Sequence, residues 1–331
     1  MPRQAGSCRS CRTLGCTDKN RISVITDIPS PADFEATAVS LLNLAWDTVS
    51  SLSHHAERSE LEAWDECGEV TDEYWAAAQK PLGNAQALIQ QGVEFLLKAR
   101  IAEVSPFLLL DRAVREWPKE SAARDTKYAE FRTVDAQDLV RLFNTVRPTR
   151  LDSAFVQRIE EQRKTRNTFI HSVDKSLRHD PQTLWRTILD VSHHLIGPAK
   201  WIGLRRAYLE STPASIAFST DEVSIELAWE CSQLLEMLKP AEQELYLGIL
   251  PKARRYICYA CALECREADI RPETAQLRPN DPDSTNVYCF MCGHIQAVDR
   301  VPCATAGCKG NVIEAHDGVC LTCFSDQPPK D

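Results

Sequence analysis

The sequence predicts a mainly α-helical protein in which a helical bundle is followed by a small cysteine-rich module. Before residue 250, apolar residues recur at the three- and four-residue spacing of amphipathic helices, and strand patterns are almost missing. After residue 251 this periodicity ends and cysteines occur in pairs. The chain therefore divides into a tail at 1–30, a helical domain at 31–250 and a cysteine-rich domain at 251–331.

The helical segments of the body follow from apolar periodicity and from the prolines and N-cap residues that interrupt it. They are expected at 34–52, 84–104, 135–146, 153–173, 181–209 and 221–247. The fifth is expected to bend near Gly197-Pro198, and Pro240 interrupts the sixth. A short apolar connector begins at Pro106, and a polar loop rich in Pro and Asp is expected at 269–286.

Composition predicts a cytoplasmic protein that binds metal. The chain has 331 residues, of which 44% are hydrophobic and 26% charged, enough for one large or two modest domains. No run approaches the roughly 20 apolar residues of a membrane helix, and the first residues lack the apolar core of a secretory signal. Fourteen cysteines, mostly in CxxC pairs, then favour metal ligation in a reducing compartment over disulfides.

Eight cysteines after residue 251 have the spacing of two structural Zn²⁺ sites. Their pairs are Cys258 with Cys261, Cys289 with Cys292, Cys303 with Cys308, and Cys320 with Cys323. Each short turn places two thiolates along one edge of a tetrahedron, and a second turn supplies the opposite edge. We expect the first two pairs to share one ion and the last two the other. The nested alternative, in which the second pair joins the third, stays open.

This cysteine-rich region resembles a tandem zinc ribbon, a module that usually binds nucleic acid or protein. Closed four-sulfur sites are structural, because they leave no open position for a substrate. Gly293 and Gly310 follow such turns, where backbone freedom helps amides approach the sulfurs. The spare donors Cys265, His294 and His316 are interpreted as surface residues that do not bind metal.

The remaining cysteines give weaker signals. Cys8, Cys11 and Cys16 offer three thiols that lack a nearby fourth ligand, so metal binding with Cys67 or a histidine and a tail with free thiols are both open. Cys231 is interpreted as a small core residue of the last body helix.

The segment at 166–171, with the sequence RNTFIH, contains Arg166, Asn167 and His171. It resembles the R-N-x3-H form of the R-x4-6-H motif of HEPN domains, helical bundles of prokaryotic defence and toxin systems. The segment QGVEFLLKA at 91–99 resembles the helix that commonly precedes this motif. The resemblance covers about 34–211. It implies a HEPN-like bundle with a metal-independent ribonuclease site, formed where two copies face each other across a homodimer.

The residue types suit that chemistry. RNA cleavage without a metal needs a group that takes the 2′-OH proton or protonates the leaving oxygen, and His171 can do either near neutral pH. Arg166 can meet the growing charge of the phosphate with a bidentate fork. On an ideal helix Asn167 lies only about 40° from His171 and could orient the imidazole, whereas Arg166 lies about 140° away. Arg166 and His171 therefore need side-chain reach, a local distortion or a second subunit to converge.

Other interpretations of these residues stay open. Arg186 and His193 form a second match to the motif, better aligned on one helix face. His171 could instead be a polar residue near a helix C-terminus, where positive charge is favourable. The pairs His54-His55 and His193-His194 are interpreted as surface or interface residues.

Charge limits the way in which the chain can bind RNA. The net charge of −9 argues against coating nucleic acid along the whole surface. The segment 141–171 is locally basic, with seven Lys or Arg against three Asp or Glu. Such a patch suffices for a few phosphate contacts, although a solvated helix face explains it equally well.

Three functions follow from these patterns. The first is a HEPN-type endoribonuclease of phage defence or a toxin-like stress response, whose zinc ribbons recognise an RNA, a partner or an activating signal. The alternative is a non-catalytic protein that dimerises through its helices and binds nucleic acid or protein through its ribbons. A regulatory subunit that neutralises a partner toxin is the third. Phosphate-binding loops, dinucleotide fingerprints, zinc-protease motifs and hydrolase nucleophile elbows are missing from the sequence.

Overall fold

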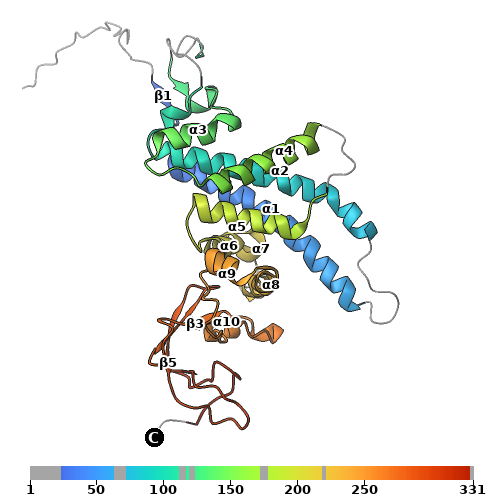
Figure 1. Cartoon of the computed structure of the whole chain (residues 1–331), viewed down its shortest axis with the longest axis vertical. Helices are drawn as coiled ribbons and strands as arrows, with labels where there is room; N and C mark the ends of the chain where they lie inside the picture. The colour runs from blue at the N-terminus through green and yellow to red at the C-terminus, as the bar shows by residue number, and fades with distance from the viewer. Residues whose placement is uncertain are drawn as a thin grey trace, which may run out of the picture.

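The computed structural model describes residues 24–62, 72–111, 117–118, 124–171, 178–217 and 221–328. Cys8, Cys11, Cys16 and Cys67, whose role the sequence leaves open, lie outside these residues. The described part is mainly α-helical, as predicted, with a small sheet near its C-terminal end. Figure 1 shows the helices stacked along the long axis and the sheet region at the end of the chain marked C. Among the described residues, no helix combines the length and apolar character needed to span a bilayer.

Two long helices form the spine of the body. Helix α1 (Pro31–Glu62) and helix α2 (Asp72–Ala102) lie side by side (Figure 1). Their facing apolar residues, including Leu42 and Trp46, are fully buried. A Cβ atom on Gly92 would lie 2.9 Å from the Leu42 side chain, so only glycine allows α1 and α2 to approach this closely. Helix α2 begins twelve residues before the predicted 84 and contains Pro81.

The remaining body helices pack around this spine. They are α3 (Ala136–Val146), α4 (Ser153–His171), α5 (Pro181–Leu195), α6 (Trp201–Glu210), α7 (Pro213–Ala217), α8 (Asp221–Met237) and α9 (Pro240–Leu247). Helices α3, α4 and α5 contact α2, and α6 contacts α8 and α9. The ring of Trp46 lies 5.4 Å from that of Trp185 and 5.2 Å from that of Trp201, which joins α1, α5 and α6 in one core.

Two segments that were predicted as single helices are pairs of helices. The segment 181–209 is broken into α5 and α6, because Gly197 has φ +145° and Pro198 follows it. The interruption predicted at Pro240 is the boundary between α8 and α9. The connector at Pro106 is the 3₁₀ helix η1 (Pro106–Leu109). Near the other end of the body, the short strands β1 (Ile25–Thr26) and β2 (Thr126–Lys127) pair in parallel, with η4 (Tyr128–Glu130) following β2.

The C-terminal region contains α10 (Tyr259–Glu264), η5 (Arg266–Ala268) and a four-stranded antiparallel sheet in the order β3-β4-β5-β6. Its strands are β3 (Ala275–Leu277), β4 (Asn286–Cys289), β5 (Ile295–Asp299) and β6 (Ile313–Glu314). The predicted loop at 269–286 is wrong in part, because β3 lies inside it. Strand β3 forms there because Ala275 and Leu277 are buried against the rest of the molecule.

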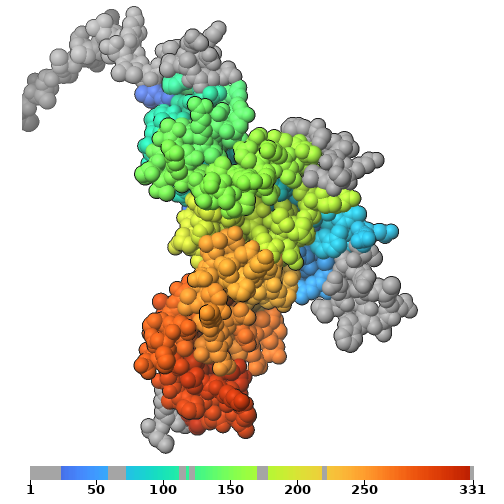
Figure 2. All heavy atoms as spheres, viewed as in Figure 1, coloured from blue at the N-terminus to red at the C-terminus, as the bar shows by residue number. Residues whose placement is uncertain are grey.

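The helical body and the C-terminal region share one apolar core. Buried residues of α8 and α9, such as Leu234 and Leu247, belong to the same cluster as Cys258, Cys261 and Ala275. Figure 2 shows the orange helical segments in direct contact with the red C-terminal region. The change in composition near residue 250 therefore marks a change in secondary structure within a continuous core.

Candidate metal centres and the Arg–His segment

The first group of four cysteines lies where α10 meets the end of β4. Cys258 is the N-cap of α10, Cys261 lies in its first turn, Cys289 ends β4 and Cys292 follows in the next turn. The Sγ atoms of Cys258 and Cys292 are 3.8 Å apart, as are those of Cys261 and Cys289. The antiparallel pairing of β3 with β4 brings the two turns together.

The second group lies near the C-terminal end of the described chain, with Cys303 and Cys308 between β5 and β6 and with Cys320 and Cys323 after β6. The Sγ atoms of Cys303 and Cys323 are 3.7 Å apart, and those of Cys308 and Cys320 are 4.0 Å apart. In each group the four sulfurs lie within 4.8 Å of one another. The predicted pairing is thus confirmed, and the nested alternative is wrong because the second and third pairs belong to different groups.

Both groups fit a tetrahedral Zn²⁺ ion. A Zn–S bond of about 2.3 Å gives a tetrahedron with edges of about 3.8 Å, close to the sulfur–sulfur distances in both groups. Polar hydrogens also point at the sulfurs, as thiolates require. The Thr274 hydroxyl lies 3.1 Å from Cys289 Sγ, and the amide of Gly310 donates to Cys308 Sγ at 3.3 Å. The two groups are therefore two structural zinc sites.

Glycine is required at two positions near the sites for different reasons. Gly293 has φ +72°, a left-handed conformation that glycine adopts without strain, and its amide donates to the carbonyl of Cys289. At Gly310 the constraint is space, because a Cβ atom would lie 2.9 Å from Cys320 Sγ and closer still to Thr322. Gly293 therefore has the predicted backbone freedom, but its amide binds a carbonyl oxygen and not a sulfur. The amide of Gly310 does approach a sulfur, as predicted, although glycine is needed there because it is small.

The spare donors stay outside the two sites. His294 and His316 are exposed, as predicted. Cys265 also belongs to neither group, but its prediction as a surface residue is wrong, because it is fully buried behind α10 in the shared core. Cys231 is fully buried in α8, which confirms it as a core residue.

Helix α4 carries the segment that resembles the HEPN motif. Arg166 donates from Nη1 to Oδ1 of the adjacent Asn167 at 3.0 Å. The Arg166 Nε atom is buried and has no hydrogen-bond partner among the described residues. His171 is the last residue of α4, and its side chain lies outside the described residues. The juxtaposition of Arg166 with His171 thus stays a prediction.

Helix α2, which contacts α4, carries two charged residues, Glu94 and Lys98, that interact with each other. Burial raises the pKa of Glu94, against the opposing effects of Lys98, Arg166 and Arg163. Further along the same interface, the ring of Phe169 lies so close to α2 that a Cβ atom on Gly83 would be 2.3 Å from it. Glu94 therefore lies close enough to Arg166 to interact with its positive charge, and glycine at position 83 lets α4 approach α2.

Arg186 and His193, the second match to the motif, lie in different environments. Arg186 donates to the carbonyl of Met237 at 2.7 Å and lies 3.4 Å from Glu242, so it ties α5 to α8 and α9. His193 instead packs edge-on against Tyr246, with ring centroids 6.1 Å apart. These contacts give Arg186 a structural role between helices.

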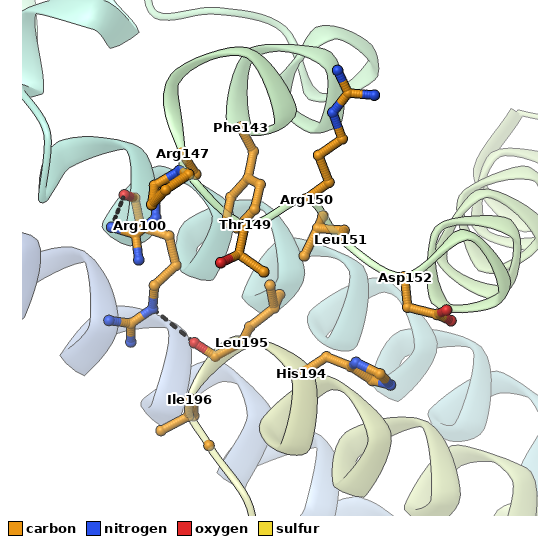
Figure 3. Close-up of a pocket in the computed structure, with 12 residues that line it drawn as sticks. Arg100, Phe143, Arg147, Thr149, Arg150, Leu151, Asp152, His194, Leu195 and Ile196 are labelled. Carbon is orange, nitrogen blue, oxygen red and sulfur yellow. Dashed lines mark hydrogen bonds between the residues drawn. The ribbon is translucent and has the colours of Figure 1, made fainter.

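A pocket of about 460 Å³ lies where the C-terminal ends of α2, α3 and α5 meet the loop before α4 (Figure 3). Arg100 and Arg147 line it, and both pair with Glu103. Arg150 extends away from the pocket in Figure 3. The arginines of this pocket are thus largely neutralised or turned outward, so it offers little net positive charge to an anion.

Ion pairs of this kind also account for much of the basic segment at 141–171. Arg147 pairs with Glu103 and Arg158 with Asp190, two carboxylates outside the segment, and Arg163 pairs with Glu160, which the count of three acids already includes. The positive charges of these three arginines are thus balanced by carboxylates of the same chain. The local excess of positive charge is therefore smaller in the structure than in the sequence.

One polar cluster was not found from the sequence. The buried carboxylate of Asp190 accepts two hydrogen bonds from Arg158, at 2.8 and 3.0 Å, and one from Tyr246 at 3.2 Å. His194 Nε2 lies 3.4 Å from the same carboxylate, and its ring stacks on Phe155. Only the four-residue spacing of Asp190 and His194 on α5 was visible in the sequence, because the other partners come from α4 and α9.

Comparison with known proteins gives no assignment. No family model, no curated protein and no solved structure matches the chain.

Proposed function

We propose that this chain is a metal-independent endoribonuclease of HEPN type, active as a homodimer, in phage defence or a toxin-like stress response. Its site consists of Arg166, Asn167 and His171, and its zinc ribbons recognise RNA or a protein partner. The observation that carries the proposal is the RNTFIH segment at the end of α4, where the Arg166 guanidinium is hydrogen-bonded to Asn167. The resemblance of this segment and of the helix before it to HEPN domains supports the assignment.

In this reaction each group has one task. His171 takes the proton of the 2′-OH, whose oxygen attacks the adjacent phosphorus and expels the 5′-oxygen of the next nucleotide. Arg166 stabilises the extra negative charge on the phosphate oxygens. The expelled oxygen takes up a proton from water, and the products carry a 2′,3′-cyclic phosphate and a 5′-hydroxyl. Asn167 orients Arg166 through the hydrogen bond from Nη1, which makes it a positioning residue.

The geometry of Arg166 also explains why a second copy belongs in the proposal. On a regular helix Arg166 and His171 point about 140° apart, so one copy brings them together only with difficulty. Two copies of α4 that face each other would place Arg166 of one subunit near His171 of the other.

The test compares purified wild type with His171→Ala, with zinc content measured before and after incubation. Both are incubated with total RNA in EDTA, and the ends produced are mapped. We expect cleavage with cyclic phosphates from wild type alone. His316→Ala is the matched control, since His316 is an exposed histidine far along the chain from α4, and it should cleave like wild type. Equal cleavage by wild type and His171→Ala would contradict the assigned site.

The second candidate is a non-catalytic binding protein, favoured by the two four-cysteine sites at the C-terminal end. In that case the helices only dimerise and the ribbons hold nucleic acid or protein. His171→Ala would then be silent, whereas Cys320→Ser would abolish binding because it unfolds the second zinc site. Absence of RNA cleavage by wild type, also under activating conditions, would favour this candidate.

A further inference from the structure

Another cavity, which the proposed function does not use, lies between α1 and α8. Its volume is about 600 Å³, within the range of about 300–1,000 Å³ that is common for small-molecule sites. Ile225 and Trp229 of α8 and Ile270, which follows η5, give it apolar surface. The Trp229 ring is held in place, because its Nε1 atom donates to Glu57 at 2.5 Å and the His54 ring packs edge-on against it at 4.9 Å. The cavity therefore offers a fixed aromatic surface to a ligand.

Three carboxylates line the same cavity. Asp47 comes from α1, and Glu222 and Glu226 lie one turn apart on α8. The side chains of Asp47 and Glu226 are 39% and 46% exposed, so a ligand can reach both. Among the described residues that line the cavity, none is a lysine or an arginine. A ligand that enters it therefore meets negative charge.

A buried arginine balances only part of this charge. Arg205 of α6 is fully buried beneath the carboxylates. Its guanidinium nitrogens lie 2.5 Å from Asp47, 2.9 Å from Glu226 and 2.7 Å from Glu230. One positive charge thus faces three carboxylates, which leaves two negative charges unbalanced. Glu222, which has no ion-pair partner in the described part of the chain, adds a third.

This excess of negative charge is costly for the protein without a ligand. Burial raises the pKa of Glu226, and the charges of Glu230 and Asp47 raise it further against the opposing effect of Arg205. A cation in contact with the carboxylates reduces their mutual repulsion. Charge complementarity therefore favours a positively charged ligand, and the apolar surface beside the carboxylates favours one that also has an apolar part.

We propose that the cavity between α1 and α8 binds a small organic cation, a protonated amine with an apolar body. Its ammonium group contacts the carboxylates of Asp47, Glu222 and Glu226, and its apolar body packs on Ile225 and Trp229. The face of an indole attracts cations, which adds to the attraction by the carboxylates. A ligand that carries phosphate is repelled by the same groups. The inference does not depend on the proposed ribonuclease activity.

The test uses the full-length, zinc-loaded protein and two probes of similar shape that differ in charge. The probes are 2-phenylethylamine, which is protonated at neutral pH, and 2-phenylethanol, and calorimetry measures the dissociation constant of each. We expect the amine to bind at least about tenfold more tightly than the alcohol, because hydrogen bonds between charged groups are the stronger ones.

One substitution and a matched control then locate the charge effect. Glu226→Gln keeps an oxygen for Arg205 and removes one charge from the cavity, so it should weaken binding of the amine about two- to fivefold and leave binding of the alcohol unchanged. Glu236→Gln removes an exposed glutamate of the same helix that does not line the cavity, and it should bind the amine like wild type. Equal weakening in both variants would show that the net charge of the protein, and not the cavity, attracts the amine, which would contradict the proposal.

A measurement on wild type decides the question even if Glu226→Gln folds poorly. The indole N–H signals of the tryptophans are followed by NMR as 2-phenylethylamine is added, and Trp229→Phe assigns the signal of interest. We expect the Trp229 signal to shift, while that of Trp201, which is buried and does not line the cavity, stays in place. Equal affinity for amine and alcohol, no binding of the amine below about 10 mM, or an unshifted Trp229 signal would overturn the proposal. Conversion of a dimer into monomers by the amine would also overturn it, because the cavity would then belong to the contact between two copies of the chain.

Discussion

The two zinc sites have the same four thiolate ligands but very different surroundings. Three cysteines of the first site are buried, and α10, which carries two of its ligand positions, lies against α8 of the helical body. At the second site only Cys320 is buried, and the sulfurs of Cys303 and Cys308 accept hydrogen bonds from nearby backbone amides. The first site is thus part of the main core through its own cysteines, whereas at the second site the neighbouring residues Val312 and Leu321, and not the four cysteines, belong to that core.

The difference shows that the ligands alone do not reveal how much of the fold is destabilised when a metal ion is lost. Zinc binding provides folding free energy to whatever structure depends on it. At the first site that structure includes the shared core, through Cys258, Cys261 and Ala275. At the second site it is the group of turns before and after β6, next to Val312 and Leu321 of the same core. Matched changes at the two sites should therefore have unequal effects.

The largest expected difference comes from removing one ligand at each site. Cys261→Ser should lower the free energy of unfolding of the whole chain by about 4 kcal/mol or more, the range reached when a metal site in a core is lost. Cys308→Ser should release one zinc ion but leave the helical transition nearly unchanged. Thermal unfolding followed by far-UV circular dichroism, with zinc content measured on both variants, tests this. Equal loss of helical stability in both variants would break the distinction between the sites.

The next largest difference between the two sites is expected in the order in which a chelator removes their zinc ions. A chelator should remove one zinc ion from wild type well before the other, because the second site is more exposed and its turns open more easily. After the first ion has left, the helical circular dichroism signal should be intact. The order is assigned by mass spectrometry of cysteines alkylated after partial removal, with Cys303 and Cys323 expected to react before Cys258 and Cys261. Simultaneous release, with early loss of helix, would contradict the comparison.

Much of this arrangement was predictable from the sequence, since cysteine spacing predicts the ligands and their pairing, and apolar periodicity predicts the body helices. Tertiary packing explains what was missed. As a spare donor outside the four pairs Cys265 is assigned to the surface, yet it is fully buried at the C-cap of α10, where it packs like a small apolar residue. Strand β3 lies in a segment of Pro and Asp that no local pattern distinguishes from a loop. The partners of Asp190 come from α4 and α9, and single-sequence patterns carry no information about such contacts.

A smaller effect is expected at two glutamines that bridge backbone segments near the sites. The buried side chain of Gln276 on β3 donates to the carbonyls of Leu250 and Ala253 and accepts from the Leu250 amide. Gln276→Ala leaves these groups without partners and should cost about 1–3 kcal/mol. Gln327, next to the second site, makes a similar set of bonds to Ala304, Ser325 and Asp326, but in a more exposed setting.

For that reason Gln327→Ala should cost less than about 0.5 kcal/mol, since water replaces the lost bonds. Urea unfolding of the two variants, monitored at the helical signal, gives both values directly. If Gln327→Ala proved as costly as Gln276→Ala, the second site would have to be more tightly joined to the body than its exposure indicates.

The smallest effect concerns a single hydroxyl group. Thr274 Oγ1 lies 3.1 Å from Cys289 Sγ in the buried first site, and its alternative acceptor, the carbonyl of Pro272, lies 3.5 Å away. With zinc bound, the thiolate is the better acceptor, because charged acceptors form the stronger bonds. Thr274→Val keeps the shape and should cost about 1 kcal/mol, seen as up to tenfold faster zinc release from the first site alone. Thr305→Val is the matched change at the more exposed second site, where it removes a hydroxyl that hydrogen-bonds Cys303 Sγ while the backbone amide of residue 305 still donates to the same sulfur. Faster release from the second site in Thr305→Val, with none from the first in Thr274→Val, would mean that burial does not strengthen outer-shell bonds in this protein.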